Sequence, residues 1–167
     1  MQLVELPGDH SEAERAQLAD GEEDVYELAD LVLPPGRSKD RRFALRDDDG
    51  RLVASAGILT ARVAVEQRAF PVVGIGGVIV TRSRRGQGLF RRVMEPALAA
   101  ARREGPDFAL LFCLRKNAFL YEKLGFATLP HPVTSTGIVI PLDTMWLALR
   151  PGAQWPPGPV TLLGPMF

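Results

Sequence analysis

Between residues 78 and 90 the chain reads Val-Ile-Val-Thr-Arg-Ser-Arg-Arg-Gly-Gln-Gly-Leu-Phe. The apolar run that leads into it, from Phe70 to Thr81, predicts a strand. Leu89 to Glu104 predicts a helix, because its apolar residues recur at helical spacing. Gly86 and Gly88 let the connecting backbone turn with its amides pointing inward, and the first turn of the helix adds free N–H groups and partial positive charge. Such a loop, with arginines beside it, suits a pyrophosphate.

The same stretch allows other interpretations. An ordinary strand-to-helix turn with solvated arginines is the simplest of them. A dinucleotide-binding loop is excluded because the third glycine of its fingerprint is missing, and no Gly-Lys-Ser/Thr of a P-loop occurs in the sequence. Nucleic-acid binding is a further alternative, because the five arginines between Arg82 and Arg92 could neutralise several phosphates. The net charge of zero, and Phe90 as the one aromatic residue among those arginines, argue against it.

The surrounding pattern predicts an α/β (α+β) protein, with a mixed sheet flanked by helices on both faces. Asp47 to Gly50 is a strong turn signal between two strands, which must then be antiparallel. From residue 70 to 124 the order strand, helix, strand, helix favours parallel pairing through a right-handed crossover. Pro96 should kink or split the helix in which it lies. The expected strands are residues 1–6, 42–46, 51–66, 70–81, 107–113 and 136–142, with an extension of the last strand to Leu149 left open. The expected helices are residues 11–19, 24–33, 89–104 and 116–124.

The composition is that of an ordinary folded protein: 46% of the 167 residues are hydrophobic, 24% are charged, and the mean hydropathy is close to zero. This excludes a wholly disordered or fibrous chain. No apolar run approaches the ~20 residues that a membrane helix needs, and the first ten residues carry acids where a signal peptide carries basic residues. A single cysteine, Cys113, excludes an internal disulfide and a cysteine-based zinc site. We therefore expect a cytoplasmic protein with no metal, no membrane contact and no nucleic-acid partner, formed by one domain over residues 1–167, with a core over about 1–127 and an extension over about 128–167.

Charge is distributed unevenly along the chain, although acidic and basic residues balance at twenty each. The first thirty residues hold ten acidic residues and one basic residue, Arg15. The predicted loop after residue 81 is strongly basic, so a local positive field there could hold an anion.

Two motifs carry a resemblance to a known family. The first is Arg85-Gly86-Gln87-Gly88-Leu89-Phe90, directly after the strand residues Val78-Ile79-Val80, and the second is Asn117-Ala118-Phe119-Leu120-Tyr121-Glu122-Lys123-Leu124-Gly125-Phe126. The first resembles the acyl-CoA loop, Arg/Gln-x-x-Gly-x-Gly/Ala, of the GNAT superfamily of acyl-CoA-dependent N-acyltransferases. The second resembles the Tyr-Glu-Lys-Leu-Gly-Phe signature that lies about 30 residues further on in that family. The match covers about residues 70–127 and follows the family's order on the predicted elements.

The resemblance implies a GNAT fold with six to seven strands, and an N-acetyltransferase that moves an acetyl group from acetyl-CoA to a primary amine by direct attack in a ternary complex. Acetyl-CoA would be a co-substrate, and no metal would take part. The strand backbone would pair with the pantetheine amides, and the loop amides would hold the pyrophosphate. Tyr121 would be the general acid that protonates the departing thiolate, although it could also merely pack. The residues implied to bind CoA are Val78, Ile79, Val80, Arg85, Gly86, Gln87, Gly88, Leu89, Phe90 and Asn117.

Three positions depart from the family pattern. Phe90 stands where the loop motif ends in a small residue, and Asn117 lies closer to Tyr121 than the family's asparagine does. Many relatives carry a glutamate at or next to the position of Gly76, and this chain has glycines there, so no obvious base accepts the amine proton. A CoA-binding protein that has lost catalysis is therefore an alternative. The candidates to replace the base are Glu66, His131, Asp143, a water chain and a strand carbonyl.

The acceptor is expected to be the amine of a small molecule, with a protein or peptide amine as the alternative. In the family, the helical region expected over residues 24–33 borders the acceptor site. Its carboxylates would attract a cationic amine there, or would simply form a solvated helix face. Trp146 and Trp155 are expected to cover the core or to line the acceptor pocket, and Cys113 to be a small core side chain. A homodimer is left open.

Overall fold

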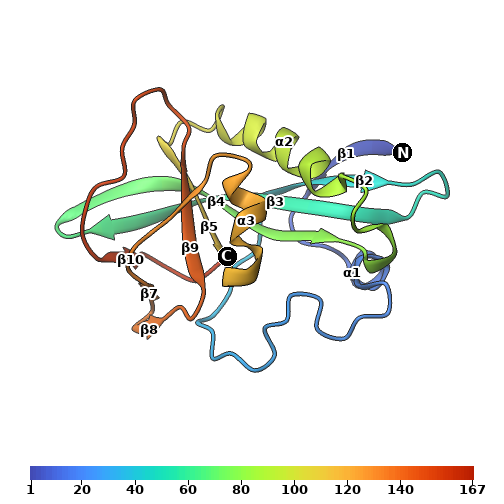
Figure 1. Cartoon of the computed structure of the whole chain (residues 1–167), viewed down its shortest axis with the longest axis horizontal. Helices are drawn as coiled ribbons and strands as arrows, with labels where there is room; N and C mark the ends of the chain where they lie inside the picture. Colours follow the sequence, from blue (N-terminus) through green and yellow to red (C-terminus); the bar gives the residue numbers. More distant parts are fainter. The chain divides into compact units, whose positions relative to one another are not determined.

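The computed structural model describes all residues from 1 to 167 (Figure 1). The strands form one mixed sheet, and the chain is organised in two compact units. The first unit comprises residues 1–30, 38–59 and 76–100, and the second comprises residues 31–37, 60–75 and 101–167. Two long strands, β3 (Leu52–Val65) and β4 (Arg68–Val80), contribute to both units.

In the first unit, neighbouring strands run in the order β1-β2-β3-β4. The β2–β3 pair is antiparallel, as the turn at Asp47 to Gly50 predicts, and the β1–β2 pair is antiparallel as well. Ser11 caps α1 in a capping box with Glu14, which fixes the start of that helix. The core of this unit includes Leu18 and Ile79, which pack in one buried cluster. The other elements of the unit are β1 (Gln2–Pro7), α1 (Glu12–Ala19), β2 (Arg41–Arg46), the 3₁₀ helix η1 (Arg82–Arg84) and nearly all of α2 (Leu89–Ala101).

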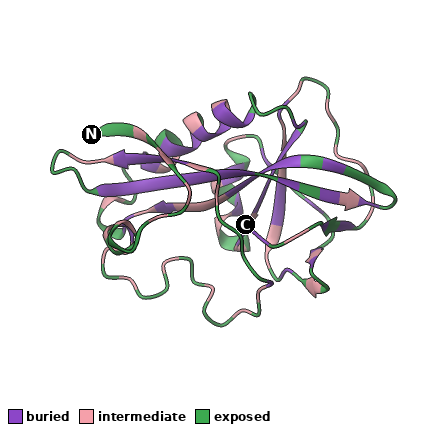
Figure 2. Ribbon diagram, turned by 180° about the vertical axis from the view of Figure 1, so that it is seen from behind, coloured by how far each residue is buried: buried purple, intermediate pink, exposed green.

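Two helix predictions for this unit need correction. No helix forms over residues 24–33, and residues 21–40 are almost all exposed or half-buried (Figure 2). The Asp24 carboxylate instead accepts the amide hydrogens of Leu28 and Ala29, both at 3.0 Å, and Glu27 has a left-handed φ of 56°. Side-chain capping of this kind competes with helical hydrogen bonds. The second correction is that Pro96 does not split α2, which is continuous over thirteen residues.

In the second unit, neighbouring strands run in the order β6-β9-β5-β4-β3-β10-β7-β8. Strands β4 and β5 pair in parallel, with Val73 opposite Ala109, which confirms the predicted parallel pairing. Strand β9 pairs antiparallel with β5 and with β6. The elements of this unit are β5 (Phe108–Cys113), the 3₁₀ helix η2 (Arg115–Asn117), α3 (Ala118–Glu122), β6 (Ala127–Thr128), β7 (Val133–Ser135), β8 (Ile138–Val139), β9 (Asp143–Ala148) and β10 (Val160–Leu162).

The mixed sheet is confirmed, and it has ten strands where six to seven were expected. The additional strands β7, β8 and β10 are only two or three residues long and lie in the extension after residue 127. The prediction of one strand over residues 136–142 is wrong. Thr136 and Gly137 have positive φ values of 51° and 78°, which form the turn of the β7–β8 hairpin, and the longer strand begins at Asp143.

An aromatic cluster fills one part of the second unit. Phe108 lies edge to face with Phe70, Trp146 and Trp155 at centroid distances of 5.9, 5.7 and 5.1 Å, which is the geometry that aromatic pairs prefer. Both tryptophans are half-buried and pack against Phe108, which fits the expectation that they cover the core. No helix of the structure is long and apolar enough to cross a membrane.

Candidate active site

The loop between β4 and α2 forms an open cradle of backbone. Gly86 and Gly88 have φ values of 77° and 74°, a conformation that glycine adopts without steric cost. No atom lies within 4 Å of the position that a Cβ would take at either glycine. Helix α2 begins directly afterwards, at Leu89, so the amides of its first turn have no acceptor within the helix. This arrangement fits the predicted pyrophosphate site.

The end of β4 leads into the cradle. Ile79 is buried in the core of the first unit, while Val78 and Val80 are half-buried. The glycines of this strand predict an irregular backbone or a close approach, and both occur. Gly77 has a φ of 59°, and a Cβ at Gly74 would lie 2.7 Å from the Phe167 ring.

Carboxylates from the acid-rich N-terminal part of the chain bind the loop. The Ser83 amide donates to Asp20 Oδ2 at 2.8 Å, and hydrogen bonds from Ser83 lower the pKa of Asp20. Arg85 forms two hydrogen bonds to Glu22, at 3.0 and 2.5 Å, and its Nε donates to the Val80 carbonyl at 3.2 Å. Arg84 lies 3.7 Å from Asp47.

These contacts join the acid-rich N-terminal residues directly to the basic loop, through Glu22 and Arg85. Arg84 and Arg85 are not simply solvated, because each is paired with a carboxylate. An anion bound in the cradle would therefore meet mainly backbone amides and fewer free guanidinium groups.

Two side chains near β4 were missed by sequence reasoning. A Cβ at Gly77 would lie 3.8 Å from the Tyr26 hydroxyl and 4.0 Å from Lys39 Cε. Both residues therefore border the irregular part of β4 within the first unit. No motif or periodicity marks them, because the segment that carries them has no regular secondary structure.

The second motif lies in the second unit. Tyr121 is on α3, its side chain is buried, and its ring meets Phe126 at 6.0 Å with an interplanar angle of 74°. The Phe126 amide donates to the Tyr121 carbonyl at 3.2 Å, and Gly125 has a φ of 94° where the chain reverses. Asn117 immediately precedes α3 and makes no side-chain capping hydrogen bond. Both residues belong to the second unit, whereas the loop residues up to Phe90 belong to the first.

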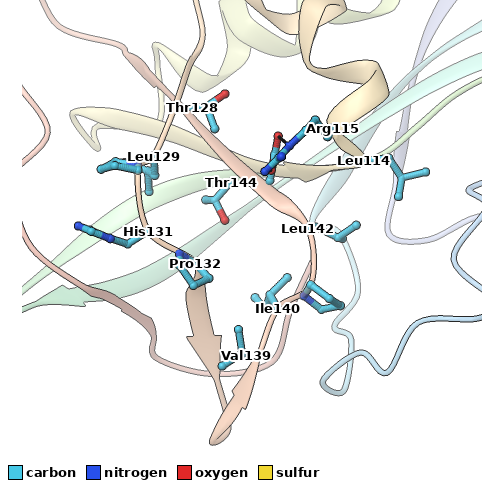
Figure 3. A pocket seen from close by; sticks show the side chains of 13 residues that line it. Leu114, Arg115, Thr128, Leu129, His131, Pro132, Val139, Ile140, Leu142 and Thr144 are labelled. Atoms are coloured by element: carbon cyan, nitrogen blue, oxygen red, sulfur yellow. Dashed lines mark hydrogen bonds and ion pairs between the residues drawn. The ribbon is translucent and has the colours of Figure 1, made fainter.

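A hollow of about 590 Å³ opens in the second unit (Figure 3). Two of the three side chains named as candidate bases, His131 and Asp143, line this hollow. The third, Glu66, lies elsewhere, at the turn between β3 and β4, where its φ is 54°. The hollow is lined by Leu114, Arg115, Thr128, Leu129, Pro130, His131, Pro132, Val139, Ile140, Pro141, Leu142, Asp143 and Thr144.

Cys113 behaves as a buried core thiol. Its Sγ lies 3.7 Å from Met145 Sδ, and burial together with the charge of Asp143 raises its pKa to about 11. A thiol with that pKa is protonated near neutral pH and is a poor nucleophile. No group of three or more His, Cys, Asp or Glu side chains is arranged to hold a metal ion.

Comparison with known proteins identifies the family. A family model described as acetyltransferase (GNAT) domain matches residues 16–129, which is more than half of the chain. No curated protein matches the sequence significantly. Among solved structures, a GNAT family N-acetyltransferase from Escherichia coli in complex with CoA is 18% identical, with a TM-score of 0.61 over 96% of this chain and 89% of that one.

Two further structures are similar. A GNAT family acetyltransferase from Brucella melitensis in complex with acetyl-CoA is 15% identical, with a TM-score of 0.58 over 95% of this chain and 94% of that one. An N-acetylglutamate synthase from Neisseria gonorrhoeae, complexed with coenzyme A and N-acetyl-glutamate, is 14% identical, with a TM-score of 0.59 over 90% of this chain and 36% of that one.

The family match thus defines an acyltransferase that uses acetyl-CoA as donor. The chain belongs to the GNAT acetyltransferase family.

Proposed function

We propose that the protein transfers an acetyl group from acetyl-CoA to the primary amine of a small molecule, by direct attack in a ternary complex. The new C–N bond forms as the C–S bond of the thioester breaks. One proton leaves the amine, and one proton reaches the CoA sulfur. The proposal takes the protein to act in the cytoplasm, as a single domain.

The observation that carries the proposal is the cradle between β4 and α2. Gly86 and Gly88 leave open space above a turn of backbone, and a helix N-terminus follows at once. Backbone amides and a helix dipole favour a negatively charged phosphate. We assign Val78, Ile79 and Val80 to the pantetheine arm, and the backbone from Arg85 to Phe90 to the pyrophosphate. Asn117 is proposed as a further contact to CoA.

Tyr121 is proposed as the general acid. A phenol can donate its proton to the departing thiolate at hydrogen-bonding distance. The buried position of the side chain limits its exposure to water, but a packing role needs the same burial. Only removal of the hydroxyl separates the two roles.

His131 and Asp143 are proposed as the candidates that accept the amine proton. Both line the same hollow, whereas Glu66 lies at a hairpin turn. Asp143 is engaged by Arg115 at 3.4 Å, which leaves the exposed His131 ring as the less encumbered group.

Thiol release from acetyl-CoA, measured against a panel of small amines, polyamines and peptides, tests the proposal. We expect turnover with a small primary amine. Turnover with peptides alone would favour a protein or peptide acceptor. If CoA raises the Tm of the protein but no amine is acetylated, the alternative of a catalytically weak CoA-binding protein replaces the proposal. That alternative is motivated by the glycines at the position where relatives carry the glutamate.

A further inference from the structure

The hollow of the second unit has the size and composition of a small-molecule site. Its volume of about 590 Å³ lies within the range of ligand pockets, which are mostly apolar with a few convergent polar groups. Its walls come from the end of β5, the segment between β6 and β7, and the segment from β8 into β9 (Figure 3). Its apolar lining consists of Leu114, Leu129, Val139, Ile140, Leu142 and three prolines.

Thr144 contributes a buried hydroxyl without a partner. The residue is 2% exposed, and its Oγ1 has no hydrogen-bond partner within the protein. Figure 3 shows this hydroxyl directed into the space that the labelled side chains surround. Buried polar atoms in native proteins almost always have a partner. A ligand oxygen in the hollow would supply one.

Arg115 contributes the accessible charge of the hollow. Its side chain is 90% exposed, whereas Asp143 beside it is 18% exposed. Nε and Nη2 of Arg115 each lie 3.4 Å from a different oxygen of the Asp143 carboxylate, so Arg115 contacts both of these oxygens. A guanidinium has five N–H donors, and three of those of Arg115 remain for a ligand.

The open polar groups of the hollow are therefore mainly donors. Arg115 and the Thr144 hydroxyl can both donate, and the exposed His131 ring adds a further N–H. The one carboxylate of the lining is already held by Arg115. A site of this kind selects a ligand that presents acceptor oxygens, and a guanidinium matches the geometry of a carboxylate best.

We infer that the hollow holds the carboxylate end of the amine acceptor, so that the acceptor is a small apolar amino acid or another amine that carries a carboxylate. The carboxylate would bind Arg115 and Thr144, and the apolar body would lie against the aliphatic side chains and prolines. This inference rests on the proposed function, which supplies the need for an amine. Arg115 also begins η2, which leads directly into the helix that carries Tyr121.

The inference is tested with two acceptors that differ only in the carboxylate, leucine and 3-methylbutan-1-amine. For the wild type we expect kcat/KM to favour leucine about tenfold or more, because hydrogen bonds to charged groups contribute on the order of a tenfold or greater effect. Arg115→Gln should reduce this preference to about twofold or less, through a higher KM for leucine. Arg62→Gln is the matched control, since it removes the same charge from an exposed arginine of the same unit.

A binding measurement without catalysis provides the second arm. N-acetyl-leucine carries the carboxylate and the apolar body but no reactive amine. Calorimetry should detect its binding to the wild type and to Arg62→Gln, with affinity lost in Arg115→Gln and weakened in Thr144→Val. The arginine is exposed and valine is nearly isosteric with threonine, so both variants should fold, which their Tm will verify.

The outcomes separate the inference from the proposed function. Binding of N-acetyl-leucine to Arg115→Gln with wild-type affinity, or an undiminished preference for leucine in that variant, would overturn the inference while thiol release still supports acetyl transfer. If no amine is acetylated, the proposed function fails. Arg115-dependent binding of N-acetyl-leucine would still decide whether the hollow is a carboxylate site.

Discussion

His10 should make the stability of the protein depend on pH between about 6.5 and 4. Its Nε2 lies 2.9 Å from the hydroxyl of the fully buried Ser55. Burial and the neighbouring Arg42 guanidinium lower the pKa of His10 from 6.5 to about 4, against the opposing charges of Glu14 and Asp9. Below pH 6.5 the unfolded chain therefore binds a proton that the folded protein does not. Stability is fully present above pH 6.5 and is lost as the pH falls towards 4.

The magnitude follows from the two pKa values. The difference between about 4 and 6.5 corresponds to at most ~3.4 kcal/mol at about 1.36 kcal/mol per pH unit. The ring is only half-buried, so solvent screening reduces the expected loss to about 1–2 kcal/mol. For a chain of this length, that loss is a decrease in Tm of roughly 3–6 °C.

Urea unfolding of the wild type and of His10→Gln at pH 7.5, 6.5, 5.5 and 4.5 measures this effect. Glutamine keeps a hydrogen-bonding group near Ser55 but does not titrate, so the wild type should lose about 1–2 kcal/mol more than the variant over this range. The carboxylates with lowered pKa, such as Asp9 and Glu14, lose their stabilising effect only at lower pH. His131→Gln is the control, because His131 is exposed. Parallel stability curves for the wild type and His10→Gln would refute the reasoning.

Three further predictions concern the proposed site. Gly88→Glu should abolish the CoA-dependent rise in Tm, because it adds bulk and negative charge to the cradle at a φ of 74°. Gly105→Glu, at another open glycine with a positive φ of 105°, should retain the rise. A full rise in Tm in Gly88→Glu would show that the loop does not bind CoA. Tyr121→Phe should lower kcat by about 10²–10⁴-fold while CoA still binds. Thr161→Val, which removes a hydroxyl from an exposed strand position, should leave kcat unchanged. If kcat is unchanged in Tyr121→Phe and the chemical step is rate-limiting, Tyr121 has only a packing role. Glu22→Gln should release Arg85 and tighten CoA binding about two- to fivefold at low salt, as expected for an exposed ion pair. Glu23→Gln is the control and should leave the CoA affinity unchanged. If Glu22→Gln raises the KM of the acceptor without changing the CoA affinity, the ion pair between Glu22 and Arg85 does not limit CoA binding.

Most of the fold could be predicted from local signals. The helix over residues 11–19, the turn at Asp47 to Gly50 and the strand–loop–helix around Gly86 each need only a few neighbouring residues, and each is present as expected. The failures occur where a side chain competes with the backbone pattern. Asp24 takes two amides that a helix over residues 24–33 would have used. Thr136 adopts a positive φ that a strand pattern does not indicate.

The candidate site was predictable only in part, for a different reason. The loop and the Tyr121 motif are contiguous in sequence and can be recognised there. The hollow forms only when β9 pairs with β5, which places Asp143 opposite Cys113 and Thr144 opposite Phe112. Arg115 then meets Asp143 across twenty-eight positions of sequence. No local pattern indicates which residues such long-range pairing will bring together, so this part of the site needed the structure.

Charge counted along the sequence is a poor guide to the acceptor, because several acidic residues of the N-terminal segment already have partners within the protein. Glu5 pairs with Arg41 at 2.9 Å, and Glu14 lies 3.3 Å from Arg42. Asp20 and Glu22 bind the loop of the proposed CoA site. Carboxylates neutralised in this way exert little attraction on a cationic amine. Beside the hollow, the guanidinium of Arg115 is paired with Asp143, but it stays 90% exposed and keeps N–H donors for the carboxylate of a ligand. We therefore favour an acceptor that brings a carboxylate with its amine over the cationic amine that the charge distribution of the sequence suggests.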